Sequence, residues 1–255
     1  MFRKRIKWWS VMLMLNGAIF TSAQAAVPSA QDVIQKMEAL LWSNSNQGNI
    51  TMVIETPYWK RSLELEVWMA RPDRTFIRVL SPKKERGIGS LRVGSQMWNY
   101  IPKIDRIVKI PPSMMLQPWM GSDFSNDDLV KESSLITDYT HEVKSADNEN
   151  STLIRIVSIP KPDAAVVWGS VESWVYADTG IPQRQLYFDE AGKAVKELLF
   201  SEVQNRDGRK IPTRWEMRPL EGKGKRTIIN INEIQFDQQI NADVFAERNL
   251  RKLNW

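Results

Sequence analysis

The stretch "RSLELEVWMARP", residues 61–72, decides the fold of this chain. Apolar residues alternate along it with charged or aromatic ones: Leu63, Leu65, Val67 and Met69 against Glu64, Glu66 and Trp68. Successive side chains of a β-strand point to opposite faces of a sheet, so this period of two predicts a long strand with one apolar face.

Similar alternation recurs along most of the chain. It predicts strands at residues 74–80, 87–93, 95–101, 105–111, 140–145, 151–159, 165–177, 182–188, 194–203, 212–220 and 225–236. The connections are short, with hairpin turns at 178–180, 189–192 and 206–208, and no helix between strands is long enough for a parallel crossover. We therefore expect a mainly β (α+β) fold: about a dozen antiparallel strands in a meander that curls on itself.

One amphipathic helix is predicted ahead of the strands. Ser29 followed by Asp32 resembles a capping box, in which side chains bond the free amides of the first helical turn. The apolar positions recur on one face, with the charged ones turned away: Val33, Met37, Leu40 and Leu41 against Lys36 and Glu38. The turn formers of residues 43–49 are expected to end the helix.

The first residues resemble a secretory signal peptide. Arg3, Lys4, Arg5 and Lys7 precede an apolar run from Trp8 to Phe20, and Ala23-Gln24-Ala25 is an A-x-A cleavage site. We expect residues 1–25 to be removed near Ala25, leaving one domain over residues 26–255; an uncleaved membrane anchor is the alternative. With no cysteine for disulfides or lipidation, the exported chain fits a bacterial periplasm.

Charge argues against a nucleic-acid partner. The whole chain has a formal net charge of +5, but residues 1–25 contain four basic and no acidic residues, which leaves +1 for residues 26–255. The basic surface expected of a nucleic-acid-binding protein is therefore missing from the predicted mature chain.

No residue set predicts catalysis, a metal or a cofactor. His141 is the only histidine and there is no cysteine, so a zinc site is not expected. Neither a nucleophile elbow nor a phosphate-binding loop is present. Asp123, Asp127 and Asp128 could bind a cation or do acid–base work, but we expect Asp127 and Asp128 to lie in the first turn of a short helix capped by Ser125 or Asn126.

Several strands have large apolar or aromatic residues on both faces, as Trp68, Trp98 and Trp174 show. Scattered surface aromatics are one explanation. We favour another, in which the concave side of the sheet is apolar and covered by helical segments. Two segments could cover it: the N-terminal helix and the Met-rich stretch "SMMLQPWMGSDFSNDDL", residues 113–129. Flexible methionines pack against irregular apolar shapes, so this stretch is predicted to be a mobile lid or a fixed plug.

At residues 65–82, "LEVWMARPDRTFIRVLSP", and 93–111, "VGSQMWNYIPKIDRIVKIP", the chain resembles the LolA-like outer-membrane lipoprotein-sorting proteins. "MGSDFSNDDL" and "ADVFAERNL" resemble features of a longer branch of that family. The resemblance implies an incomplete β-barrel with an apolar cavity under helical lids. By position, Arg71 matches the arginine that tethers the lid in that family.

We therefore expect a non-enzymatic periplasmic carrier that binds acyl chains of lipoproteins or related lipids and moves them towards the outer membrane. Its partners would be those acyl chains, with an inner-membrane transporter and an outer-membrane acceptor as further candidates. The residues predicted to line the cavity or lid are Trp68, Met69, Trp98, Met114, Met115, Leu116, Trp119 and Met120. The alternatives are an accessory module docked on an inner-membrane exporter and, less favoured, a hydrolase using the three aspartates.

Overall fold

The computed structural model describes residues 28–130, 134–146, 152–164, 166–222 and 224–252. The predicted signal peptide, residues 1–25, lies outside the described residues. Within them, no helix is long and apolar enough to cross a membrane.

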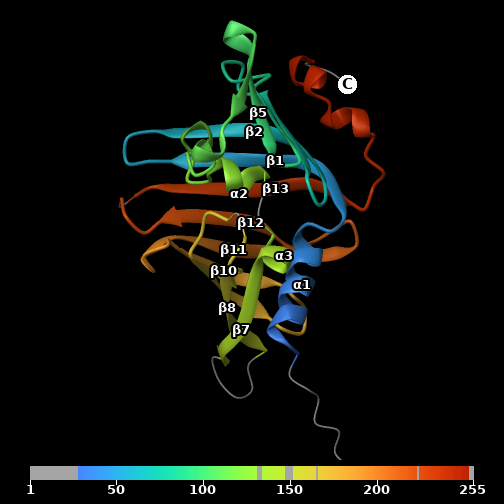
Figure 1. Ribbon diagram of the computed structural model, residues 1–255. Coiled ribbons are helices and arrows are strands. Elements are labelled where there is room, and N and C mark those ends of the chain that lie inside the picture. The colour runs from blue at the N-terminus through green and yellow to red at the C-terminus, as the bar shows by residue number, and fades with distance from the viewer. Residues whose placement is uncertain (1–27, 131–133, 147–151, 165, 223, 253–255) are drawn as a thin grey trace, which may run out of the picture.

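Thirteen strands form one open antiparallel sheet (Figure 1). The strands are β1 (Ser45–Glu55), β2 (Lys60–Ala70), β3 (Arg74–Ser81), β4 (Gly89–Val93), β5 (Gln96–Ile101), β6 (Arg106–Ile110), β7 (Tyr139–Ala146), β8 (Leu153–Pro160), β9 (Ser170–Tyr176), β10 (Pro182–Phe188), β11 (Ala194–Arg206), β12 (Arg209–Pro219) and β13 (Arg226–Phe236). Their order is β6-β5-β4-β3-β2-β1-β13-β12-β11-β10-β9-β8-β7, so β6 and β7 are the two edges. The predicted mainly β, incompletely closed fold is confirmed.

Strand β1 is the one long strand that the sequence did not predict. The turn formers Ser45–Asn49 were expected in a loop, but they form the start of β1 because β2 and β13 pair with it on both sides. The β1–β13 pair connects the first six strands to the last seven. A register shift at Asn49/Ile50 brings the backbones very close: a Cβ on Gly48 would lie 2.1 Å from the carbonyl oxygen of Glu233.

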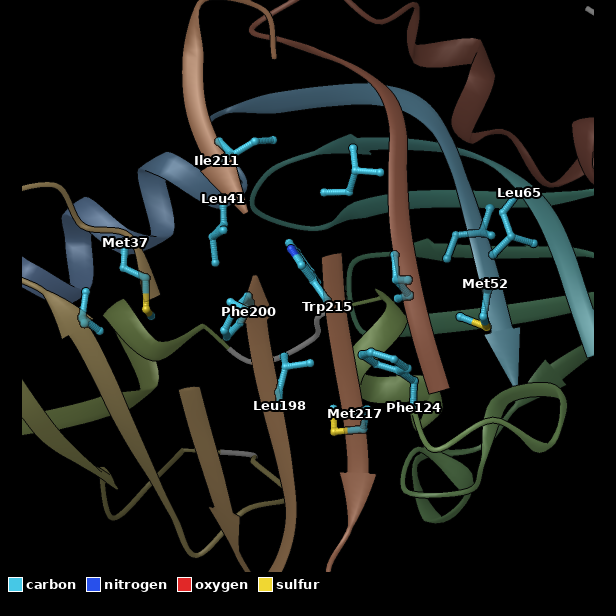
Figure 2. Packing of buried hydrophobic residues seen from close by; sticks show 14 of the residues in the cluster. Met37, Leu41, Met52, Leu65, Phe124, Leu198, Phe200, Ile211, Trp215 and Met217 are labelled. Atoms are coloured by element: carbon cyan, nitrogen blue, oxygen red, sulfur yellow. The ribbon is translucent and has the colours of Figure 1, made fainter. Parts of the chain in front are cut away.

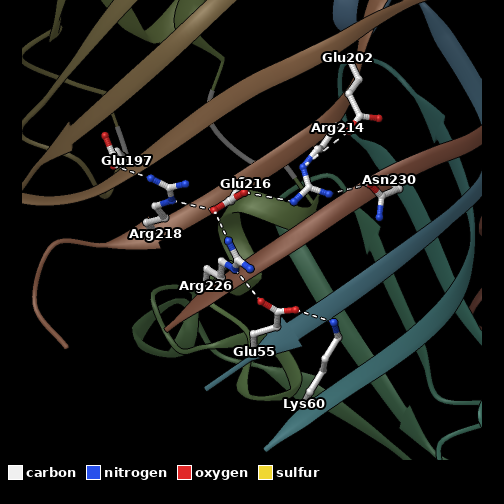
Figure 3. A network of polar contacts seen from close by, with 9 residues as sticks. All are labelled: Glu55, Lys60, Glu197, Glu202, Arg214, Glu216, Arg218, Arg226 and Asn230. Carbon is white, nitrogen blue, oxygen red and sulfur yellow. Dashed lines mark hydrogen bonds and ion pairs between the residues drawn. The ribbon is translucent and has the colours of Figure 1, made fainter. Parts of the chain in front are cut away.

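An ion network on the sheet surface reinforces this seam (Figure 3). Glu55 of β1 pairs with Arg226 of β13 and with Lys60, each at 2.6 Å. Glu216 of β12 accepts from Arg218 at 2.7 Å and from Arg226 at 3.3 Å. Burial raises the pKa of the Glu216 carboxyl, but hydrogen bonds and charges from the surrounding arginines outweigh it, and the net pKa is lowered.

The inner face of the sheet, defined here as the face that packs against the helices, holds the main core (Figure 1). Helix α1 (Ala30–Leu41) is confirmed, with the Ser29 hydroxyl accepting from the Asp32 amide at 3.1 Å. The other helices are α2 (Asn126–Val130), α3 (Leu135–Asp138) and the short 3-10 turns η1 (Pro102–Ile104), η2 (Pro112–Met114), η3 (Trp119–Gly121), η4 (Ala242–Phe245) and η5 (Glu247–Arg251).

The outer face has a smaller core under the C-terminal segment. Trp68, Phe76 and Leu91 pack there against Phe245 of η4 and Leu250 of η5. Strand β2 therefore packs on both sides: its inner face lies under the helices, and Trp68 on its outer face packs with the C-terminal turns.

The close approach at the seam predicts that Gly48→Ala destabilises the protein. The added methyl group overlaps backbone atoms, which cannot move away as a flexible side chain can, so we expect a loss of about 1–3 kcal/mol in the free energy of unfolding. Urea unfolding measures it. Ser62→Ala, at an exposed position of β2, is the control. Equal stability of the two variants would contradict the described seam.

Candidate ligand cavity

Two cavities lie beneath the helices on the inner face, each of about 80 Å³. The first lies over β9–β12 and the second over β1–β3 and β13. Both are lined by the same five residues where they meet: Leu41, Trp42, Phe124, Asp128 and Trp215. These shared residues form a partition between two parts of one apolar interior.

Aromatic rings make up most of the partition. Trp42, just after α1, meets Trp215 of β12 edge to face, with ring centroids 5.2 Å apart. Phe200 of β11 packs against the other side of Trp215 at 5.4 Å. Figure 2 shows Leu41 of α1, Phe124 of the loop before α2, and Phe200 and Trp215 of the sheet pointing towards one another. Trp215 is fixed further because its indole N–H donates to the Pro212 carbonyl at 2.9 Å.

The first cavity has a polar wall. Tyr187 donates to Gln185 at 3.0 Å, and Gln185 donates to Ser173 at 3.1 Å. Lys196 of β11 pairs with Asp128 of α2, and both side chains are less than a tenth exposed. The Lys196 ammonium also lies 4.4 Å from the ring centroid of Trp168. Burial raises the pKa of the Tyr187 hydroxyl well above its ordinary value.

The second cavity has an almost wholly apolar wall. Ile50, Val67 and Met69 line it from β1 and β2, and Ile229 and Ile231 line it from β13. A cavity lined mainly by aliphatic and aromatic side chains offers dispersion contacts over most of its wall, which suits a hydrocarbon chain.

We call residues 112–130, with η2, η3 and α2, the lid segment, because they cross the inner face. A few polar contacts hold it to the sheet. Asp123 bonds Thr227 of β13 through its amide at 2.9 Å and its carboxyl at 2.7 Å. The Arg61 guanidinium donates to the Met120 carbonyl, and Lys196 holds Asp128.

Arg71 connects β2 to two helices. Its guanidinium pairs with Glu38 of α1 at 3.0 Å and donates to Ser134, the N-cap of α3, at 3.3 Å. The expectation that Glu38 turns away from the core was wrong: its side chain is 1% exposed. Helical spacing alone could not show this, since a buried carboxylate is tolerated only where a cation from another element reaches it.

The predicted Met-rich residues do not share one environment. Met115 is buried and packs against Met97 of β5. Met114 and Leu116 on either side of it are exposed, at 44% and 49%. Prolines at 111, 112 and 118 break this stretch into single turns, so neighbouring side chains point in different directions.

The second half of the same stretch packs more deeply. Trp119 is 2% exposed and lies in the main core, where its indole N–H donates to Ser90 of β4 at 2.9 Å. Met120 packs against the same core. Trp119 and Met120 therefore anchor the middle of the lid segment to the core.

The predicted residues Trp68, Met69 and Trp98 lie on different faces. Met69 lines the second cavity, whereas Trp68 and Trp98 lie on the outer face near the C-terminal turns. Adjacent residues of a strand face opposite ways, so Trp68 and Met69 cannot both reach one cavity.

Sequence reasoning missed the partition residues Trp42, Phe124 and Trp215. Trp42 follows the last apolar position of the predicted helix, and Trp215 alternates with charged residues along its strand. The positions of Trp42 and Trp215 in the sequence indicate that each lies on an apolar face. Which residues meet across the curved sheet depends on the order in which the strands pair, and the sequence does not show that order.

The aspartates have structural contacts. Asp127 and Asp128 lie in the first turn of α2, as predicted, and Asp128 exchanges hydrogen bonds with the hydroxyl and amide of Ser125. Burial raises the pKa of the Asp123 carboxyl. Within the described residues, no group of three or more histidine, aspartate or glutamate side chains is placed to hold a metal.

Comparisons with known proteins were made by sequence and by structure. A family model described as "Uncharacterized protein" matches residues 71–252. The comparison with curated proteins gives no match.

Solved structures with the same fold cover nearly the whole described chain. A DUF1329 family protein from Desulfovibrio piger has a TM-score of 0.77 at 20% identity, covering 87% of this chain and 97% of that one. An outer membrane lipoprotein-sorting protein domain from Vibrio parahaemolyticus has a TM-score of 0.74 at 17% identity, covering 88% and 98%. A LolA superfamily protein from Nitrosomonas europaea has a TM-score of 0.73 at 18% identity, covering 87% of this chain and 99% of that one. The chain shares their fold.

His141 makes the stability sensitive to acid. It lies in β7, with Nδ1 2.9 Å from the Ser158 hydroxyl, and burial lowers its pKa below the ordinary value of about 6.5. The folded state therefore takes up this proton later than the unfolded state. Its contribution to stability is complete above the ordinary pKa and is lost as the pH falls towards the folded-state pKa.

We predict that the melting temperature of the wild type falls more steeply below that pH than the melting temperature of His141→Gln, which cannot titrate there. Thermal melts over a pH series measure the difference. Parallel curves for the two proteins would show that His141 is not the group responsible.

Proposed function

We propose that this chain, which belongs to the family whose model matches residues 71–252 and has the fold of the LolA superfamily, is a carrier of acyl chains. The observation that carries the proposal is an apolar inner face that extends over both halves of the sheet, from β3 to β8 in sheet order, and is covered by short helical segments. The acyl chains would belong to lipoproteins or related lipids. The chain would work without catalysis, in the periplasm, between an inner-membrane donor and an outer-membrane acceptor.

The cavities as described are too small for a long acyl chain. Each holds about 80 Å³, whereas pockets for drug-sized ligands hold about 300–1,000 Å³. Phe124 of the lid segment lies between the two cavities and packs in the main core. In this proposal the described conformation is the closed one, and moving the lid outwards withdraws Phe124 and joins the cavities.

The energy for opening comes from the ligand. Burying an acyl chain contributes about 0.8 kcal/mol for each CH₂ group, so a long chain gains several kcal/mol. Against this stand the lid contacts, among them the Lys196–Asp128 pair and the Arg61 bond to the Met120 carbonyl. Asp128 lines both cavities and lies between them and Lys196; once Asp128 moves away, a polar end of the ligand can take the place of its carboxylate beside the Lys196 ammonium.

Filling the second cavity should block loading. Ile50 lines that cavity from β1, and Ile50→Trp adds a large ring to the space. We expect at least a tenfold weaker affinity for a long-chain fatty acid, measured by displacement of a fluorescent fatty acid and by native mass spectrometry.

The matched control for Ile50→Trp is Thr51→Trp, the next residue, whose side chain points to the other face. It should bind like the wild type. If both variants bind equally well, or if the wild type binds no fatty acid or lysolipid, the carrier proposal fails.

Arg71 should set the balance between closed and open states. Arg71→Leu removes the tether of α1 and α3 and leaves the buried Glu38 without this cation. We expect a loss of roughly 3 kcal/mol in stability, as is typical when one member of a buried pair is removed. Because the closed state is weakened most, the apparent fatty-acid affinity should rise.

Urea unfolding, hydrogen exchange at α1 and fatty-acid titration measure these effects. The double variant Glu38→Leu/Arg71→Leu should recover part of the stability, because no buried charge is left uncompensated. An Arg71→Leu protein with unchanged exchange at α1 and unchanged affinity would rule out the tether.

A further inference from the structure

Three turns of the first half of the sheet follow alternate strands. In an antiparallel meander every second connection returns to the same end of the strands, so the β1–β2, β3–β4 and β5–β6 turns share that end, and Arg61 of the first lies 4.0 Å from Glu85 of the second. We call their residues 56–61, 82–88 and 102–106 the basic rim. The carrier function proposed above assigns no role to this rim.

The basic rim has a strong excess of positive charge. It contains seven basic residues and two acidic ones, although the mature chain as a whole is close to neutral. Glu85 is buried 4.0 Å from Arg61, and Asp105 pairs with Arg251 at 3.1 Å. The exposed cations Lys83, Lys84, Arg86, Lys103 and Arg106 have no ion-pair partner within the described part of the chain.

Exposed apolar side chains project from the same turns. Tyr58 is 93% exposed and Trp59 is 45% exposed at the β1–β2 tip, and Ile104 is 58% exposed at the β5–β6 tip. The first tip has a defined shape, because the Thr56 hydroxyl accepts from the amides of Tyr58 and Trp59 at 3.2 and 3.0 Å. Its turn therefore holds Tyr58 out in solvent rather than folding it back.

We propose that the basic rim docks on a bilayer surface rich in anionic lipid headgroups, with Tyr58 and Trp59 inserted at headgroup level. Tyrosine and tryptophan favour that depth because one end of each ring is apolar and the other is polar. Clusters of four to eight lysines and arginines are typical of binding to anionic lipids. A protein-binding patch would place its apolar residues in one contiguous area, whereas these lie on separate tips between cations.

The rim touches the lid at one point. Arg61 of the rim donates to the Met120 carbonyl in η3, and its guanidinium also lies 5.5 Å from the ring centroid of Trp59. Docking through Trp59 therefore brings the bilayer next to a residue that holds the lid closed. Docking itself does not require the carrier function. Its role in transfer rests on the proposed function, because the rim would then be the surface by which the carrier meets a membrane.

The test is flotation of the predicted mature chain with vesicles of phosphatidylglycerol and phosphatidylethanolamine, beside vesicles of phosphatidylcholine alone. We expect binding to the anionic vesicles only, weakening as salt is added. Lys83→Gln/Lys84→Gln/Arg86→Gln should weaken it on the order of a hundredfold, because each cation near an anionic surface contributes about fivefold. Tyr58→Ser/Trp59→Ser should weaken it at least tenfold.

Matched controls remove the same groups elsewhere. Lys144→Gln/Lys210→Gln/Arg248→Gln changes the charge equally at exposed positions outside the rim, and Tyr176→Ser/Val203→Ser removes exposed apolar groups outside it. Both should bind vesicles like the wild type. A wild type that ignores anionic vesicles, or rim variants that bind as well as the controls, would overturn the proposal. Rim-dependent binding only to membranes that retain their proteins would overturn it in favour of a protein partner.

Loading in solution separates this inference from the carrier proposal. Lys83→Gln/Lys84→Gln/Arg86→Gln should take up free fatty acid like the wild type, because none of these three residues lines a cavity. Normal vesicle binding without any loading would refute the carrier proposal and leave the docking surface in place. Normal loading without vesicle binding would refute the docking surface and leave the carrier proposal in place.

Discussion

The pairing of β1 with β13 is the constraint on which the rest of the structure depends. It joins two groups of strands, formed from the two ends of the chain, into one sheet whose apolar inner face continues across both. The sheet does not close, so no opposing strands can cover that face. The chain covers it with α1, α3 and the lid segment, and a cover made of short helices can be displaced without breaking the sheet.

The contacts of that cover are unevenly strong. Trp119 and the apolar face of α1 are deeply buried, whereas Asp123, Asp128 and Glu38 are held by polar contacts to Thr227, Lys196 and Arg71. Buried ion pairs are costly to desolvate, so they add little net stability while fixing one arrangement. Such contacts can define a closed state and still be exchanged for a ligand.

Alternation in the sequence predicted most strands, the helix and the open antiparallel fold, because the period of two or 3.6 is a local property. It missed β1, where the partners on both sides outweigh the turn propensity of Ser45–Asn49. It also could not tell which face of β2 is inner, so Trp68 and Met69 were both predicted at the cavity. The contact between Trp42 and Trp215 in the partition depends on the curvature of the sheet over distant strands, which no local sequence pattern encodes.

Opening of the lid on loading is the central claim, and a distance measurement tests it most directly. The chain has no cysteine, so spin labels can be attached at Gln117→Cys on the lid segment and Ser62→Cys on β2, both exposed. Double electron–electron resonance on the protein saturated with a long-chain fatty acid should show a second, longer distance between the two labels that the protein without fatty acid lacks. A saturated protein with the unloaded distance distribution would contradict the account.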